Sequence, residues 1–211
     1  MITSTSSSQV KHVVNLQKKA KLRKEEKQFV VEGVKMVSEA PADRLVKVYV
    51  SETFKADNEE FLERMNYDSI GKDVLEIVTD NVFMRMADTQ TPQGIMAVVR
   101  MSDTDLEGIL SDKHNPLLLI IENLQDPGNL GTIVRMAEGA GVTGIIMSSN
   151  TVDIYNPKTI RSTMGSLYRV PVIYVDDICE AADVCKSKGV TVYAACLLYT
   201  SPSPRDTERS R

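Results

Sequence analysis

A chain of 211 residues, of which 42% are hydrophobic and 26% charged, is long enough for one large globular domain or two modest ones. No apolar run approaches the roughly 20 residues of a membrane span, and the first residues, MITSTSSSQV, lack the apolar core of a secretory signal. Three cysteines without a CxxC pair and only two histidines argue against a zinc site or a disulfide framework. We therefore expect no metal and a cytoplasmic location.

The net charge of −4 conceals an uneven distribution along the chain. Residues 1–35 carry eight Lys or Arg and three acids, whereas the remaining residues carry 17 and 26. A basic segment on an acidic protein favours a local contact with a polyanion, although lysines on an exposed helix would give the same balance.

The first hundred residues alternate between helical and strand patterns. The segment VKHVVNLQKKAKLRKEEK (10–27) places apolar residues at helical spacing among its lysines, which predicts one basic helix. Further strands are expected at 29–33, 46–51, 74–79 and 94–101, and further helices near 34–37, 57–65 and DNVFMRM. This alternation predicts a layered α/β domain, and the polar segment 103–116 predicts a linking helix and turn after it.

The second unit is more regular and predicts an open parallel sheet. Its first apolar run is continuous, as is typical of a parallel strand covered on both faces. Helical segments separate the four expected strands, which are LLLII (117–121), VTGIIMS (142–148), VPVIYV (170–175) and VTVYAA (190–195).

The pattern stops after residue 196. The segment CLLYTSPSPRDTERSR has two Ser-Pro pairs, three arginines and no periodicity. Its composition permits a disordered tail, and it also resembles translated sequencing-adapter sequence. We therefore expect residues 197–211 to be a non-native or disordered tail.

A glycine-containing loop opens a helix in the stretch IENLQDPGNLGTIVRMAEGAG (121–141), which is where α/β proteins often bind an anionic ligand. The glycines Gly128 and Gly131 form GxxG, which does not match the GxGxxG of dinucleotide folds, and Asp153 is a weak match to the expected ribose-binding acid. Gly131 is followed by Thr-Ile, where a P-loop requires Lys-Ser/Thr. Asn129 and Arg135 are the unusual polar residues, although Asn129 could be only a helix cap and Arg135 only a solvated side chain.

The segment NLGTIVR, the helix end after it and GIIMS resemble motif 1 of the SpoU (TrmH-type) RNA methyltransferases. The segment NPKTIRSTMGSLYRVPV (156–172) is similar to that family's second helix and following strand. The basic segment through VVEGVKMV, together with TPQGIMAVV (91–99), resembles the L30e-like substrate-binding module that often precedes the catalytic domain. The match runs in the family's order over roughly residues 2–195, and it implies an L30e-like α/β domain at 1–103 and a partial, SPOUT-like methyltransferase domain at 104–196.

The resemblance implies transfer of a methyl group from S-adenosylmethionine to a ribose 2′-hydroxyl of rRNA or tRNA. Arg135 would activate the hydroxyl or lie against an RNA phosphate, and Asn129 would help to organise the same site. Glu32 occupies a family-typical position, although it could equally be an exposed charge at a strand end. The basic helix would contact the RNA backbone through Lys11, Lys18, Lys19, Lys21, Arg23, Lys24 and Lys27.

The chain departs from the family near its last residues. In the family, a Gly-Glu-x-x-Gly-like loop and a Ser-Leu-Asn motif build a C-terminal trefoil knot that holds the cofactor, and neither motif occurs here. Ala194 and Ala195 would reach the first edge of that cofactor pocket, so we expect a C-terminally truncated enzyme without most of the pocket, whose family homodimer is in doubt. The alternatives are a catalytically inactive RNA-binding α/β protein and, if the first domain is disregarded, a small nucleotide-binding oxidoreductase.

Overall fold

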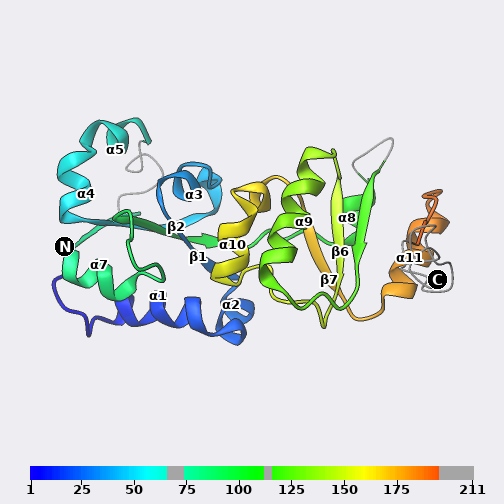
Figure 1. Cartoon of the computed structure of the whole chain (residues 1–211), viewed down its shortest axis with the longest axis horizontal. Coiled ribbons are helices and arrows are strands. Elements are labelled where there is room, and N and C mark those ends of the chain that lie inside the picture. The colour runs from blue at the N-terminus through cyan, green and yellow to red at the C-terminus, as the bar shows by residue number, and fades with distance from the viewer. Residues whose placement is uncertain (66–73, 112–115, 195–211) are drawn as a thin grey trace, which may run out of the picture.

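The computed structural model describes residues 1–65, 74–111 and 116–194, and it contains two sheets joined side by side (Figure 1). The first sheet has the strand order β1-β4-β2-β3. Strand β4 (Ile95–Arg100) lies antiparallel to both β1 (Gln28–Glu32) and β2 (Leu45–Ser51), and β3 (Leu75–Val78) lies parallel to β2. These strands confirm the mixed α/β pattern predicted for the first hundred residues.

Helices cover both faces of the first sheet. On one face, α1 (Ser8–Lys18) and α7 (Asp80–Met86) pack their apolar residues, including Val13 and Phe83, against the sheet. The remaining helices of this domain are α2 (Ala20–Glu26), α3 (Val34–Ser38), α4 (Glu52–Asp57) and α5 (Glu59–Met65), with a 3₁₀ turn η1 (Ala42–Arg44) before β2.

The second sheet is parallel and has the order β5-β6-β7, formed by Leu118–Ile121, Gly144–Ser148 and Val172–Val175. Its central strand is buried on both faces because Ile145 and Met147 point to one core and Ile146 to another. Helices α9 (Pro127–Gly139) and α10 (Pro157–Thr163) and the 3₁₀ turn η2 (Ser166–Tyr168) cover the first of these faces. Helices α8 (Leu106–Ser111) and α11 (Ile178–Ser187) cover the second.

A shared core and several polar contacts join the two sheets. Helix α10 contacts β1 of the first domain, and the rings of Phe29 and Tyr155 stack across the junction with centroids 4.7 Å apart. The hydroxyl of Tyr168 donates a hydrogen bond of 2.9 Å to the carbonyl oxygen of Met36. The domain boundary predicted between residues 103 and 104 falls in the segment between β4 and α8.

The structure corrects two predictions about local structure. The single helix expected over 10–27 is two helices, because Lys19 adopts an extended conformation (φ −114°, ψ 102°) between α1 and α2. The strand expected at 190–195 is not formed over the described residues 190–194, where the side chains of Val192 and Tyr193 are exposed. A β-branched run forms a strand only when it can pair and bury one face, and this segment does neither. The tail predicted at 197–211 lies outside the described residues.

Within the parts of the chain that the structure describes, every helix is too short or too polar to cross a bilayer.

Candidate active site

The loop between β5 and α9 is fixed at the carboxyl edge of the parallel sheet. The Asn123 backbone N–H donates to Ser148 Oγ at 2.9 Å, and Gln125 Nε2 donates to the Asn150 carbonyl oxygen at 2.8 Å. Asp126 then caps α9 by accepting a 2.6 Å hydrogen bond from the backbone N–H of Asn129. The cap is therefore Asp126, and the side chain of Asn129 is exposed in the first helical turn.

Gly131 serves the packing of two helices. A Cβ atom at this position would lie against Ser162 Cβ and 2.8 Å from the carbonyl oxygen of Thr159, both on α10. The GxxG pattern of the sequence thus places its second glycine where α9 crosses α10, since only glycine permits so close an approach. A packing role for Gly131 agrees with a loop that matches neither the dinucleotide-binding pattern nor the P-loop pattern.

Arg135 lies on the same stripe of α9 as Gly131 and Glu138, because residues at i, i+4 and i+7 share one helical face. The two flanking members of the stripe contact the α10–η2 region. Gly131 meets Ser162, and the Glu138 carboxylate accepts a 2.5 Å hydrogen bond from Ser166 Oγ and a further hydrogen bond from Arg169. The contact with Arg169, followed by that with Ser166, lowers the pKa of Glu138.

The guanidinium of Arg135 itself is exposed, and it has no hydrogen bond or ion pair with any residue that the structure describes. Asn129 precedes it by six residues, which is about one and two-thirds helical turns. Helix α9 therefore presents the two predicted site residues on different faces and does not by itself bring them together.

A pocket of about 250 Å³, which was not predicted from the sequence, lies at the carboxyl ends of all three parallel strands. Its lining includes Glu122, Asn123, Ser148, Asp176 and Asp177. Ligands of open α/β sheets bind at the carboxyl edge of the sheet. The polar residues that follow the predicted strands could therefore have indicated this pocket. Three carboxylates suit a ligand that offers hydroxyl or ammonium donors.

The cofactor contact predicted at Ala194 and Ala195 falls at the last of the described residues. Ala194 is exposed in an irregular segment after α11, and Ala195 lies outside the described residues. No group of three or more His, Cys, Asp or Glu side chains suited to a metal ion occurs among the described residues.

The predicted RNA-binding cations divide into two groups. Six lysines of the α1–α2 region have exposed side chains, namely Lys11, Lys18, Lys19, Lys21, Lys24 and Lys27. Arg23 has a different position from the one predicted: it is 3% exposed and lies inside the protein. We therefore leave Arg23 out of the proposed RNA contact.

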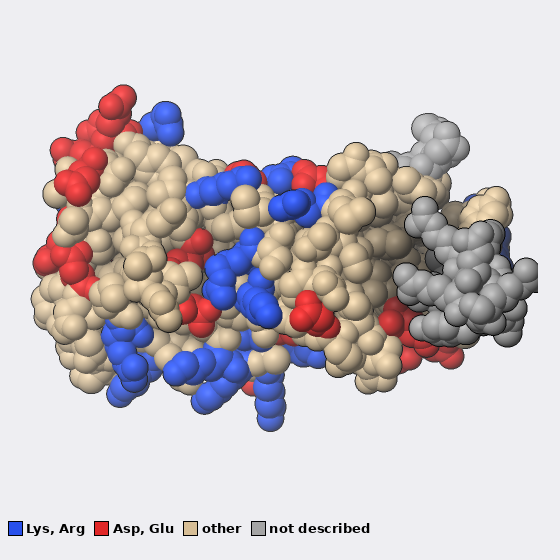
Figure 2. Space-filling view, viewed as in Figure 1, with Lys and Arg blue, Asp and Glu red and all other residues tan. Residues whose placement is uncertain are grey.

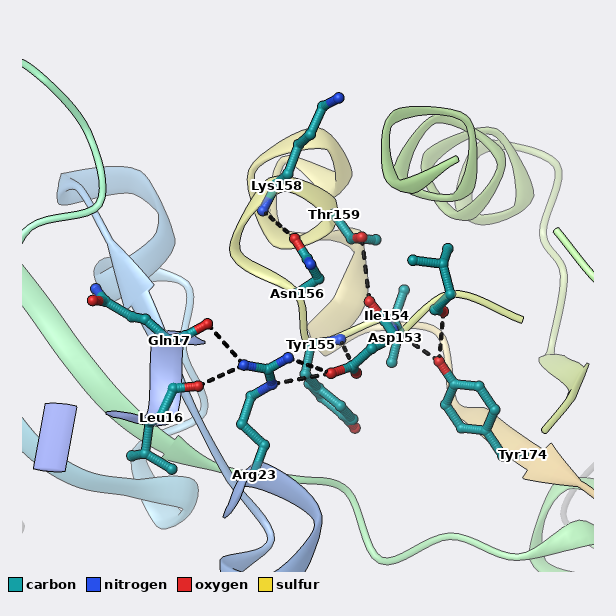
Figure 3. Close-up of polar contacts among 11 residues, drawn as sticks. Leu16, Gln17, Arg23, Asp153, Ile154, Tyr155, Asn156, Lys158, Thr159 and Tyr174 are labelled. Carbon is teal, nitrogen blue, oxygen red and sulfur yellow. Dashed lines mark hydrogen bonds and ion pairs between the residues drawn. The ribbon is translucent and has the colours of Figure 1, made fainter. Parts of the chain in front are cut away.

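Arg23 joins the two domains (Figure 3). Its Nε and Nη2 atoms donate hydrogen bonds of 3.0 and 2.6 Å to Asp153 Oδ2 in the second domain. Its Nη1 atom donates to the carbonyl oxygens of Leu16 and Gln17, which the break after α1 leaves without helical partners. Arg23 thus satisfies two carbonyl groups at the helix break and pairs with Asp153, whose Oδ1 atom accepts a 2.9 Å hydrogen bond from the backbone N–H of Tyr155.

Comparison with known proteins agrees with a two-domain α/β protein of this kind. Residues 7–97 match the MRM3-like substrate binding domain, and residues 116–209 match the SpoU rRNA Methylase family. A TrmH-family protein from Porphyromonas gingivalis superposes with a TM-score of 0.74 at 26% identity, over 97% of this chain and 76% of that one. An rRNA methyltransferase from Sinorhizobium meliloti, solved with S-adenosylmethionine bound, gives a TM-score of 0.71 at 25% identity, over 86% and 67% of the two chains.

Two curated relatives agree in sequence. A 23S rRNA guanosine 2′-O-methyltransferase from Bacillus subtilis is 34% identical over 60% of this chain and 48% of its own length. The mitochondrial rRNA methyltransferase 3 of Homo sapiens is 32% identical over 76% of this chain and 38% of its own length. The chain thus spans about half or less of these relatives. Residues 116–209 are thus similar to the SpoU rRNA methylase family, and a region that matches the MRM3-like substrate binding domain precedes them. Because one of these relatives is mitochondrial, the cytoplasmic location stays a prediction.

Proposed function

We propose that this protein acts in the methylation of a ribose 2′-hydroxyl of rRNA, with S-adenosylmethionine as the methyl donor. The observation that carries the proposal is the guanidinium of Arg135. Three other arginines of the second domain or of the junction, Arg23, Arg161 and Arg169, are held in ion pairs. Arg135 is exposed without a partner among the described residues, on a helix whose position is fixed on both sides of it.

An arginine side chain is protonated at physiological pH, so its simplest role is electrostatic. It can hold an RNA phosphate through two parallel hydrogen bonds, or stabilise the negative charge that develops on the 2′-oxygen. Neither role requires the guanidinium to lose a proton. Asn129 lies on a different face of α9 from Arg135, so the helix alone does not place both residues against the same ribose.

The cofactor enters the proposal from the family and from the neighbour solved with it. S-adenosylmethionine would supply the methyl group. Of the two predicted contacts, Ala194 is exposed and Ala195 lies outside the described residues, so we assign no step to residues around the cofactor. A homodimer, which the family resemblance implies, belongs to the proposal on the same basis.

The exposed lysines of α1 and α2 would contact the RNA backbone. Figure 2 shows Lys and Arg atoms along the edge of the molecule that these helices form and over the junction of the two domains. Phosphate contacts of this kind fix the position of the RNA without reading its sequence.

The test is incubation of a version of the chain that is extended by the family's two C-terminal knot motifs with rRNA transcripts and S-adenosylmethionine carrying a labelled methyl group. We expect label at a ribose 2′-oxygen, located by resistance of the adjacent phosphodiester to alkaline cleavage. A chain that binds rRNA but transfers no label would instead support the alternative, an RNA-binding protein without catalytic activity. A chain that neither binds rRNA nor transfers label would contradict both.

A further inference from the structure

A groove of about 360 Å³ lies between the two domains, on the side of α10 that faces α3. The first domain contributes Lys35 and Met36 from α3 and the segment around Gln93 before β4. The second domain contributes Arg161 and Met164 from α10 and its C-cap. The described lining thus combines the exposed side chain of Met164 and the edge of Met36, which is only 6% exposed, with two cationic side chains and the Glu32 carboxylate.

The groove is held in shape by contacts inside the first domain. The Glu32 carboxylate accepts a 3.0 Å hydrogen bond from the backbone N–H of Asp88 and another from the hydroxyl of Thr89. The Gln93 Oε1 atom accepts the backbone N–H of Val34 at 2.8 Å, beside Gly33 at φ +96°. The acid that the family resemblance singled out, Glu32, is therefore used to fix a loop and not to receive a ligand.

The cations at the groove remain accessible although they have partners. Arg161 Nη1 lies 2.6 Å from Asp88 Oδ2, and the Arg161 side chain is still 41% exposed. Lys35 Nζ lies 3.9 Å from Glu39 Oε1, and its side chain is 56% exposed. Exposed pairs of this kind contribute little to stability, so both cations can turn toward an anionic ligand at small cost.

The groove and the Arg135 stripe of α9 both border the α10 region. Met164 follows α10 directly, and its side chain is 44% exposed. The Arg135 stripe of α9 contacts this helix at Ser162 and the turn after it at Ser166, on either side of Met164. A strand that lay in the groove and continued over the end of α10 would therefore approach Arg135.

We infer that this groove binds one unpaired nucleotide of the RNA substrate, with its base against the exposed side chain of Met164 and its phosphates against Lys35 and Arg161. This inference rests on the proposed RNA substrate. Methionine sulfur makes favourable contacts with aromatic rings, and only an unpaired base can offer its face to them. The two cations beside an apolar lining match a nucleotide, which joins an apolar ring to an anionic phosphate.

Two fluorescein-labelled probes of equal length test the inference, an RNA hairpin with an unpaired loop and a blunt RNA duplex. Met164→Glu and Lys35→Glu place a negative charge in the groove, and we expect each to raise the Kd for the hairpin about tenfold in a fluorescence anisotropy titration. The Kd for the duplex should change less than about twofold. The matched controls Met84→Glu, on α7 with a 54% exposed side chain, and Lys55→Glu, on α4, should change neither.

Thermal unfolding of each variant shows whether it folds as the wild type does. If Met164→Glu does not fold, the uncharged variant Met164→Gln replaces it. Groove variants that bind the hairpin as the wild type does, or that weaken both probes equally, would overturn the groove while leaving the proposed function intact. A wild-type chain without affinity for either RNA would overturn the groove and the RNA-binding part of the proposed function together.

Discussion

Arg23 and Asp153, which are 130 residues apart in the chain, form an ion pair of 2.6 Å at the junction of the two domains. Their side chains are 4% and 17% exposed, so the pair lies largely away from solvent. The same guanidinium also donates hydrogen bonds to the carbonyl oxygens of Leu16 and Gln17 in the last turn of α1. One side chain thus fixes the basic helices relative to the SpoU domain.

Arg23→Ala should lower the free energy of unfolding by about 3 kcal/mol, because it leaves Asp153 buried without its partner. Urea denaturation measures this change. Lys21→Ala, whose side chain is 87% exposed, is the control and should change the free energy by less than about 0.5 kcal/mol. If the pair acts as a unit, the double variant Arg23→Ala/Asp153→Ala should cost less than the sum of the two single variants. Additive losses would contradict this role.

Gly131→Ala should lower the free energy of unfolding by about 1–3 kcal/mol, because its Cβ would push α10 away from α9. Gly139 lies in the same helix and has open space where a Cβ would stand. Gly139→Ala is therefore the matched control, and it should be neutral or stabilising. Equal effects of the two substitutions in urea denaturation would show that the helix crossing does not require a glycine.

The stability that Glu138 contributes should depend on pH. Hydrogen bonds from Arg169 and Ser166 lower its pKa in the folded state. This contribution is therefore fully present above the ordinary pKa of glutamate and is lost as the pH falls through the lowered value. We expect Glu138→Gln to be less stable than the wild type at pH 7, with a difference that shrinks toward pH 3, as measured by urea denaturation at each pH. The same pH dependence in Glu180→Gln, an exposed position on α11, would contradict the assignment.

Charge reversal of Lys18, Lys19 and Lys21 should weaken RNA binding and reduce its salt dependence. Each lost phosphate contact should reduce the slope of log Kd against log salt by about 0.7 to 0.9. Filter binding between low and moderate salt measures both quantities. The paired reversal of Lys55 and Lys188, which are exposed on α4 and after α11, is the control. Wild-type affinity that does not change with salt would exclude the α1–α2 surface as the contact.

In a version of the chain that is extended by the family's two C-terminal knot motifs, Arg135→Ala should abolish methyl transfer to rRNA while leaving the fold intact, since the side chain has no partner among the described residues. Arg135→Lys keeps the charge but not the two parallel hydrogen bonds, so partial activity in this variant would favour a purely electrostatic role. Turnover in Arg135→Ala equal to that of the wild type would remove this residue from the mechanism.

Local patterns predicted the parts of the fold that depend on neighbouring residues. The continuous apolar run at 117–121 and the segment VTGIIMS at 142–148 predicted parallel strands, and the structure confirms both, with the two faces of β6 buried. The segment VTVYAA at 190–195 is also rich in β-branched and apolar residues, yet residues 190–194 form no strand. Composition cannot indicate whether a neighbouring strand is available for pairing.

The sequence by itself determined the α/β class, the basic character of the first helices and the family resemblance carried by Asn129 and Arg135. Periodicity and charge are properties of residues close together in the chain, so they are visible there. Only the tertiary structure decided that Arg23 is a buried link to Asp153, that Gly131 is a helix-crossing residue, and that Lys35 and Arg161 share one groove. Each of these roles depends on a partner far away in sequence, and folding alone brings the two together.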